Sequence, residues 1–138
     1  MKKPEEIKLE FTREWVRRAE NDYRITEHLF ESGEAFAYGV TFHAQQTVEK
    51  YMKAFLVWHQ IEFKKTHDIA VLLRSIASVA SELLEILAEA RELTPYGVEY
   101  RYPGDYPEVT VVDAEKSFRL AALVRSEVRN RLPHEAIE

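Results

Sequence analysis

The sequence predicts an all-α domain, an up-and-down antiparallel bundle of about five helices with a Tyr/Pro-rich loop before the last helix. Apolar residues recur at helical spacing along several long segments, and few segments show the alternation that strands require. At 138 residues the chain is long enough for a core of its own, so we expect a single domain over residues 1–138. We expect residues 1–9 to be poorly ordered.

Two long helices are predicted in the first half of the chain. The first covers residues 10–32, where apolar residues form a stripe of roughly helical period, and Gly33 then ends it. The second covers residues 35–59, because no glycine or proline follows Gly39 within this segment. The stripe of the first helix contains Phe11, Trp15, Ala19, Tyr23, Ile25, Leu29 and Phe30.

Two shorter helices are predicted after a connector. Thr66 is expected to cap a helix over residues 68–77. Asp68 would lie in its first turn as a structural carboxylate, favoured there by the helix dipole. Another helix is predicted over residues 81–92, and it ends before Pro95 because the residue preceding a proline disfavours the helical conformation.

The segment 96–110 differs in composition from the rest of the chain. It contains two prolines, two glycines and four of the seven tyrosines, so we expect a long loop here. Loops of this length in a compact domain are unusual and often functional. A last helix is predicted over residues 112–132, and Pro133 is expected to end it.

Composition narrows the classes of function. The chain has no cysteine, and its five histidines lack the spacing of a zinc or di-iron site, so we expect no metal and no cofactor. The net charge of −5 argues against a protein that coats DNA non-specifically, although a local basic groove is compatible with it. No apolar run approaches the roughly 20 residues that span a bilayer. The N-terminus lacks the apolar core of a signal peptide, so we expect a cytoplasmic protein that does not enter a membrane.

Polar side chains interrupt the second predicted helix where its apolar neighbours indicate burial. Glu49 and Lys53 are four residues apart and share one face, and Gln46 and Lys50 lie within about one turn of them. Buried polar side chains are unfavourable unless they are paired. These side chains therefore either join the helix to its neighbours or face a binding cleft.

A carboxylate lies among the apolar residues of the first predicted helix. An isolated buried carboxylate is unfavourable, so we expect Asp22 to pair with Lys50 or Lys53 across the helix pair. We interpret this pair as structural, because buried ion pairs can fix the register of packed helices.

Two further candidates for ligand binding lie near helix ends. His67 precedes a predicted helix N-terminus, where free N–H groups favour anions, and it either contacts a ligand or satisfies a neighbouring carbonyl. Arg101 lies between two tyrosines, one of them Tyr102. Its guanidinium would bind a phosphate while the rings stack on a base. Alternatively, this segment is an aromatic plug over the bundle end, with Arg101 paired to an acid of the second helix.

The end of the last predicted helix carries the residue types of metal-independent RNA cleavage. That reaction needs an imidazole that takes the 2′-OH proton near neutral pH and a cation that stabilises the phosphate. His134 and Arg129 have these chemistries, and Asn130 lies beside the arginine. Alternatively, these residues belong to a solvated, frayed C-terminus.

These pieces together resemble the HEPN family (higher eukaryotes and prokaryotes nucleotide-binding). The resemblance implies a bundle of about five helices. It also implies that the protein is usually dimeric and often partnered with a minimal nucleotidyltransferase in a toxin–antitoxin-like system. The motifs that carry it occur in order along nearly the whole chain, and they are Ala19-x-x-Asp22, Gln45-Gln46-x-x-Glu49-Lys50-x-x-Lys53-Ala54, Thr66-His67-Asp68 and Arg101-Tyr102-Pro103.

The resemblance leaves three functions open. In the enzyme alternative, Arg129, Asn130 and His134 match the arginine–histidine motif of metal-independent endoribonuclease toxins, although here the motif lies close to the end of the chain. In another alternative, the domain is purely a structural interaction module. The leading expectation is a homodimeric module, partnered with a nucleotidyltransferase, that binds a nucleotide or RNA phosphate through Gln46, Glu49, Lys50, Lys53, His67, Arg101 and Tyr102.

Overall fold

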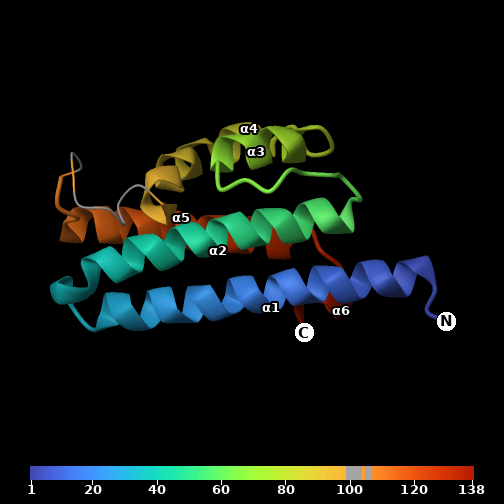
Figure 1. Cartoon of the computed structure of the whole chain (residues 1–138), viewed down its shortest axis with the longest axis horizontal. Coiled ribbons are helices and arrows are strands. Elements are labelled where there is room, and N and C mark those ends of the chain that lie inside the picture. Colours follow the sequence, from blue (N-terminus) through green and yellow to red (C-terminus); the bar gives the residue numbers. More distant parts are fainter. Residues whose placement is uncertain (99–103, 105–106) are drawn as a thin grey trace.

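The computed structural model of the protein describes residues 1–98, 104 and 107–138. Within these residues the chain is helical and contains no strand, so the predicted all-α fold class is confirmed (Figure 1). No helix in this part of the chain is both long and apolar enough to cross a bilayer. The elements are α1 (Pro4–Glu31), the 3-10 helix η1 (Glu34–Phe36), α2 (Ala37–Trp58), α3 (Ile69–Ala77), α4 (Leu83–Ile86), the 3-10 helix η2 (Ala88–Gly97), α5 (Val111–Arg129) and α6 (His134–Ile137).

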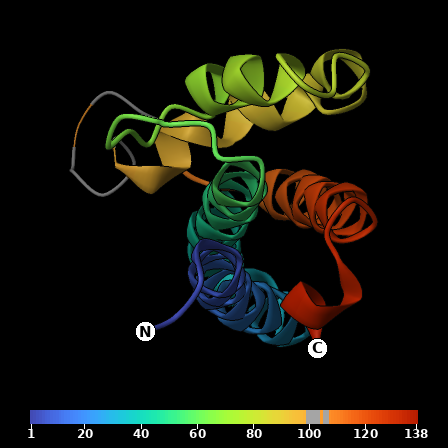
Figure 2. The same ribbon diagram turned by 90° about the vertical axis from the view of Figure 1, so that its right-hand side faces the viewer.

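The helix α2 is the centre of the fold. It packs antiparallel to α1 on one side and contacts α5, α3 and η2 on the others (Figures 1 and 2). Viewed along the helices, α3, α4 and η2 form a layer on the side of α2 that lies away from α1 (Figure 2). The short α6 lies against α1. A helix contacted on nearly all sides must bury most of its surface, and α2 does so.

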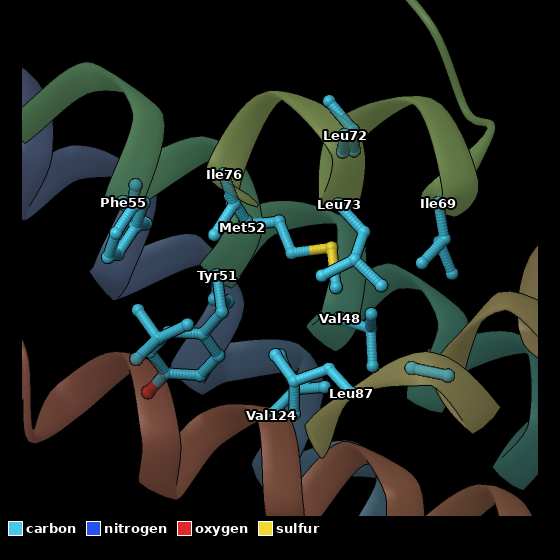
Figure 3. Packing of buried hydrophobic residues seen from close by; sticks show 14 of the residues in the cluster. Val48, Tyr51, Met52, Phe55, Ile69, Leu72, Leu73, Ile76, Leu87 and Val124 are labelled. Atoms are coloured by element: carbon cyan, nitrogen blue, oxygen red, sulfur yellow. The ribbon is translucent and has the colours of Figure 1, made fainter. Parts of the chain in front are cut away.

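The main core lies where α2 meets α3, η2 and α5. The side chains of Met52, Phe55, Leu73 and Ile76 belong to this core, and in Figure 3 Met52 of α2 extends between Ile76 and Leu73 of α3. Each is essentially inaccessible to solvent, and burying an apolar side chain of this size contributes about 1.5–3 kcal/mol. The ring of Tyr51 enters the same core and its hydroxyl points toward α5 (Figure 3).

The first helix begins earlier than the sequence predicts. It starts at Pro4 rather than at residue 10, so residues 4–9, which we expected to be poorly ordered, are helical. Proline fits the first helical position because its N–H would be unpaired there anyway. The side chain of Glu6 accepts a hydrogen bond from the backbone N–H of Lys3 at 3.3 Å and satisfies the helix start. These capping signals outweigh the charged composition of the N-terminal residues.

The cap of α3 is Asp68, not Thr66 as predicted. The carboxylate of Asp68 accepts from the backbone N–H of Ala70 at 2.9 Å, and the helix begins at Ile69. The hydroxyl of Thr66 accepts instead from the N–H of Asp68 at 3.0 Å. Both side chains therefore stabilise the start of α3. Asp68 is structural, as predicted, but it is the N-cap residue rather than a residue of the first turn.

The helix predicted over residues 81–92 is divided into two elements. The α-helical part is confined to α4, and the chain continues as the 3-10 helix η2, which passes through Pro95 and ends at Gly97. Proline has no N–H to continue the hydrogen-bonded turns, and η2 ends two residues after Pro95. Gly97 packs directly on α2, where a Cβ atom would lie 2.8 Å from the side chain of Gln45.

The last predicted helix also ends early. Helix α5 stops at Arg129 rather than at residue 132, and a tight turn leads into α6, so the chain end is not frayed. The turn is closed by the N–H of Leu132, which donates to the carbonyl of Arg129 at 3.3 Å. Leu132 and Ala136 are buried, and their burial holds α6 against the bundle.

Candidate functional site

Most of the predicted polar residues of α2 meet around one buried carboxylate. The side chains of Gln45 and Lys53 donate to the two oxygens of Glu49, at 3.1 and 3.0 Å. Nδ1 of His67, from the connector before α3, lies 2.9 Å from Oε1 of the same carboxylate. Gln46 donates to the side-chain oxygen of Gln45 at 2.6 Å. We call these five residues the Glu49 cluster.

The Glu49 cluster is buried at its centre and reaches solvent at His67, whose side chain is 63 % exposed. Glu49 and Lys53 are only 4 % and 7 % exposed. Burial favours the neutral acid, but the hydrogen bonds from His67, Lys53 and Gln45 outweigh it and hold the pKa of Glu49 below its ordinary value. No buried side-chain nitrogen or oxygen in the described part of the chain lacks a partner. The cluster therefore joins α2 to the connector, and its polar atoms are already engaged with one another.

The predicted ligand-binding set is only partly brought together. Gln46, Glu49, Lys53 and His67 belong to the Glu49 cluster. Lys50 does not, because it faces α1 instead. The predictions for Arg101 and Tyr102 fall outside the described residues.

A second polar group links α1 to α2. Nζ of Lys50 lies 2.5 Å from Oδ2 of Asp22, and Nδ1 of His43 lies 2.9 Å from Oδ1. Of the two partners expected for Asp22, Lys50 is therefore the one that the structure provides. Burial opposes ionisation of Asp22, but the hydrogen bonds from His43 and Lys50 lower its pKa below the ordinary value.

A third group joins α1, α2 and α5. Arg125 donates to both oxygens of Glu20 at 2.7 Å, and the hydroxyl of Tyr51 donates to Glu20 at 2.6 Å. Burial opposes ionisation of Glu20, but these bonds lower its pKa from 4.5 to about 2. Burial and the acceptor Glu20 raise the pKa of Tyr51 to about 12. The same hydroxyl accepts from Arg129 at 3.3 Å, so the network positions that guanidinium.

A concavity on the described surface follows α1. It encloses about 770 Å³, and we call it the α1 surface. Helix α2 adds His43 and Lys50 to it, while α5 and α6 add Arg129 and residues 136–138. Six cationic side chains line the α1 surface against three carboxylates. The cations are Arg13, Arg17, Arg18, Arg24, Lys50 and Arg129, and the carboxylates are Glu20, Asp22 and Glu138.

The residues of the predicted cleavage motif are not gathered in one place within the chain. Arg129 lines the α1 surface, where it also donates to the carbonyl of Ile137 at 3.3 Å. Asn130 is the exposed residue that follows the end of α5. His134 begins α6 with its side chain 78 % exposed, and its Nε2 lies 3.1 Å from Glu138. Only the arginine of the motif therefore lies in the concavity.

The described residues contain no group of three or more acidic, histidine or cysteine side chains that would hold a metal ion. The chemistry that the α1 surface supports is anion binding, because guanidinium and ammonium groups pair with phosphate oxygens.

Comparison with protein families decides the classification. The family model of the HEPN domain matches residues 12–131, which is most of the chain. The chain belongs to the HEPN domain family. The structure is also similar to a crystal structure of ST0689, an archaeal HEPN homologue, with a TM-score of 0.69 and 25% sequence identity. That similarity covers 87% of this chain and 96% of the homologue. No curated protein matches this chain at a significant level.

The resemblance inferred from the motifs is thus confirmed, and the chain is a helical module of a nucleotide- and RNA-related family. Sequence reasoning nevertheless missed several residues of the α1 surface of this HEPN domain. Arg13, Arg17 and Arg24 were not among the predicted site residues, although Arg13 and Arg17 share a helix face at a spacing of four residues. No sequence signal indicated that His43 would meet Asp22, because the contact joins two helices.

Proposed function

We propose that this HEPN module binds RNA or nucleotide phosphates on the α1 surface. The observation that supports the proposal is the excess of cationic side chains there, six against three carboxylates, in a protein whose net charge is −5. A local excess of positive charge in a concavity attracts phosphate irrespective of the net charge.

Some cations of the α1 surface are already paired: Arg17 and Arg18 lie 2.6 and 3.0 Å from Glu14, and Arg13 lies 4.0 Å from Glu138. Asp22 is engaged by Lys50, and Glu20 is engaged by Arg125, which does not line the concavity. Among the described residues no carboxylate lies within ion-pair distance of Arg24, and the hydrogen bonds of Arg129 go to the neutral oxygens of Tyr51 and Ile137. Each guanidinium has five N–H donors, so Arg24 and Arg129 keep donors for phosphate.

The predicted cleft around Glu49 is a weaker candidate in this proposal. Its donors are already paired with its one buried carboxylate. A phosphate would have to displace that carboxylate, which would leave a buried charge unpaired. We therefore propose that the Glu49 cluster fixes α2 relative to α3, and that ligand binding takes place on the other side of α2.

Titration with ATP, GTP and a short single-stranded RNA tests the proposal. We expect saturable binding of at least one of them, and Arg24→Gln should weaken it by on the order of tenfold through the loss of a charge-assisted contact. The matched control is Arg74→Gln, which removes the same charge from α3 without touching the α1 surface. Absence of binding by the wild type, or equal weakening by both variants, would refute the proposal.

We also propose that the protein acts as a homodimer with a minimal nucleotidyltransferase in a toxin–antitoxin-like pair. The support is the family membership. Sedimentation of the purified protein tests the dimer, and co-purification with the nucleotidyltransferase encoded nearby tests the partnership. A monomer at micromolar concentration would refute the first part.

Metal-independent cleavage of RNA is the second candidate function. Arg129 favours it, because the cation of the predicted motif lies on the proposed phosphate-binding surface. In this candidate His134 moves the proton and Arg129 stabilises the developing charge, with a second copy of the chain completing the site. An RNA cleavage assay in EDTA tests this candidate function. Cleavage activity that survives His134→Ala would exclude His134 as the residue that moves the proton.

A further inference from the structure

Another concavity lies at the end of the bundle where α1 leads into α2. Its volume is about 280 Å³, and it shares no residue with the α1 surface. The turn between α1 and α2 and the start of α5 lie at the same end of the bundle (Figure 1), and the concavity is formed between them. We call it the η1 pocket, and its apolar lining consists of Phe30, Ala37, Val40, Val111 and Ala114.

Small residues leave the η1 pocket open. Ala37 and Ala114 are buried, and each contributes only a methyl group to the small core that α1, α2 and α5 form at this end. Gly33 also lines the pocket, with a φ of 110° that L side chains rarely adopt, and a Cβ atom there would meet no atom within 4 Å. Protein interiors contain few voids larger than a water molecule, and an apolar cavity of about 150 Å³ is enough to hold benzene. The η1 pocket therefore has room for a small ligand.

Two carboxylates border this otherwise apolar pocket. Glu34 of η1 and Glu115 of α5 both line it, and neither carboxylate forms an ion pair or a hydrogen bond with another described residue. Lys116, which follows Glu115 in the chain, pairs with Glu92 at 3.0 Å instead. Two carboxylates beside one concavity produce a negative potential there, and that potential attracts a cation.

The η1 pocket therefore matches a ligand with an apolar body and a cationic end. Its apolar walls would remove an alkyl chain from water, and Glu34 and Glu115 would pair with an ammonium group. The size of the pocket favours a small molecule over a protein, since a stable protein interface buries about 800 Å² on each partner and only eight residues line this pocket.

We propose that the η1 pocket binds a small aliphatic amine. The alkyl chain of the amine lies against Phe30, Ala37 and Ala114, and its ammonium group pairs with Glu34 and Glu115. Binding is non-covalent, so no bond forms or breaks. The η1 pocket acts independently of the α1 surface, which shares none of its residues and has the opposite balance of charge.

Hexylamine is the probe, and a methyl NMR titration of the protein measures its binding. We expect saturable shifts of the Ala37 and Ala114 methyl signals with a Kd on the order of 1 mM, the affinity of an efficient ligand of this size. Hexanol has the same chain without the charge and should bind on the order of tenfold more weakly. The double variant Glu34→Gln and Glu115→Gln should weaken hexylamine binding to a similar extent. Glu31→Gln is the matched control, because it removes the same charge from the exposed end of α1 outside the pocket, and its Kd should stay within about twofold of the wild type.

A variant that fills the pocket gives an independent readout. Ala114→Leu should abolish hexylamine binding and leave RNA binding by the α1 surface unchanged. If this variant does not fold, Val111→Phe fills the pocket from a partly exposed position and serves the same purpose. Equal binding of hexanol and hexylamine, or no saturable binding of hexylamine by the wild type, would overturn the assignment. Hexylamine binding that persists in both the double variant and the filled variant would also overturn it. None of these variants changes a residue of the α1 surface, so failure here leaves the proposed binding of RNA to be judged by its own titration.

Discussion

At the scale of single residues, buried carboxylates decide how the helices are joined. Glu20, Asp22 and Glu49 each accept from at least two side chains, and each bond set includes a partner on another element. Removing one partner of such a group leaves a buried charge without compensation, which is more destabilising than the pair is stabilising. These three acids are therefore expected to be sensitive positions.

Glu20 makes the stability of the protein depend on pH in the acid range. Its pKa is about 2 in the folded protein and 4.5 ordinarily, so its contribution is complete above pH 4.5 and is lost as the pH falls toward about 2. A pKa shift of this size corresponds to about 3 kcal/mol for a fully buried group, and solvent screening makes the contribution of the partly exposed Glu20 smaller. Urea unfolding of the wild type and Glu20→Gln should show a stability difference at pH 6 that shrinks steadily between pH 5 and pH 2. A difference that does not change over this range would contradict the assignment.

At the scale of elements, the apolar periodicity predicted the long helices, but it predicted neither where they end nor the 3-10 helices. The apolar stripe of α1 and the uninterrupted pattern of α2 were sufficient, because each helix is long and buries a continuous face. The starts of α1 and α3 differ from the predicted ones, because local capping at Pro4 and Asp68 determines where each helix begins. The 3-10 helix η2 was missed because its form depends on packing against α2.

The close contact between η2 and α2 requires a residue without a side chain at position 97. A Cβ atom at Gly97 would lie 2.8 Å from the side chain of Gln45, which is buried in the Glu49 cluster. We expect Gly97→Ala to lower the free energy of unfolding by about 1–3 kcal/mol through overpacking.

Gly104→Ala is the control for this change, because an added Cβ there would meet no atom within 4 Å. Thermal or urea unfolding of the two variants measures the difference. Equal stability of the two would show that Gln45 moves aside without penalty and that η2 does not lie as close to α2 as described.

At the scale of the whole molecule, charge is distributed unevenly over an acidic protein. Only the α2 part of the Glu49 cluster was indicated by the sequence, because those residues are close along one helix, whereas the contact of His67 with Glu49 was not. The α1 surface was not, because it combines residues of α1 and α2 with Arg129 and α6, which only the tertiary fold brings together. Spacing along the sequence indicates which residues are neighbours on one helix, but it does not indicate which residues of different helices are in contact.

The uneven charge predicts a salt dependence for RNA binding. If about four cations of the α1 surface contact phosphates, log K should fall with log salt concentration with a slope near −3, because each contact with a single strand contributes about −0.7. Arg24→Gln should make the slope shallower by about 0.7, and Arg74→Gln should leave it unchanged. Binding measured by fluorescence anisotropy between 50 and 300 mM salt (about a sixfold range) gives the slope. A slope near zero would exclude phosphate contacts as the source of affinity.

The uninterrupted helix α1 also determines what shape of ligand fits. Arg13, Arg17 and Arg24 follow one another along it at intervals of about 6 Å and about 10 Å, since each residue advances the axis by 1.5 Å. Helix α1 has no proline after its first position and no glycine, so these intervals are fixed before any ligand arrives. A flexible single strand can adjust the spacing of its phosphates to these fixed arginines. A stiff double helix cannot, so the protein should bind single-stranded nucleic acid in preference to a duplex.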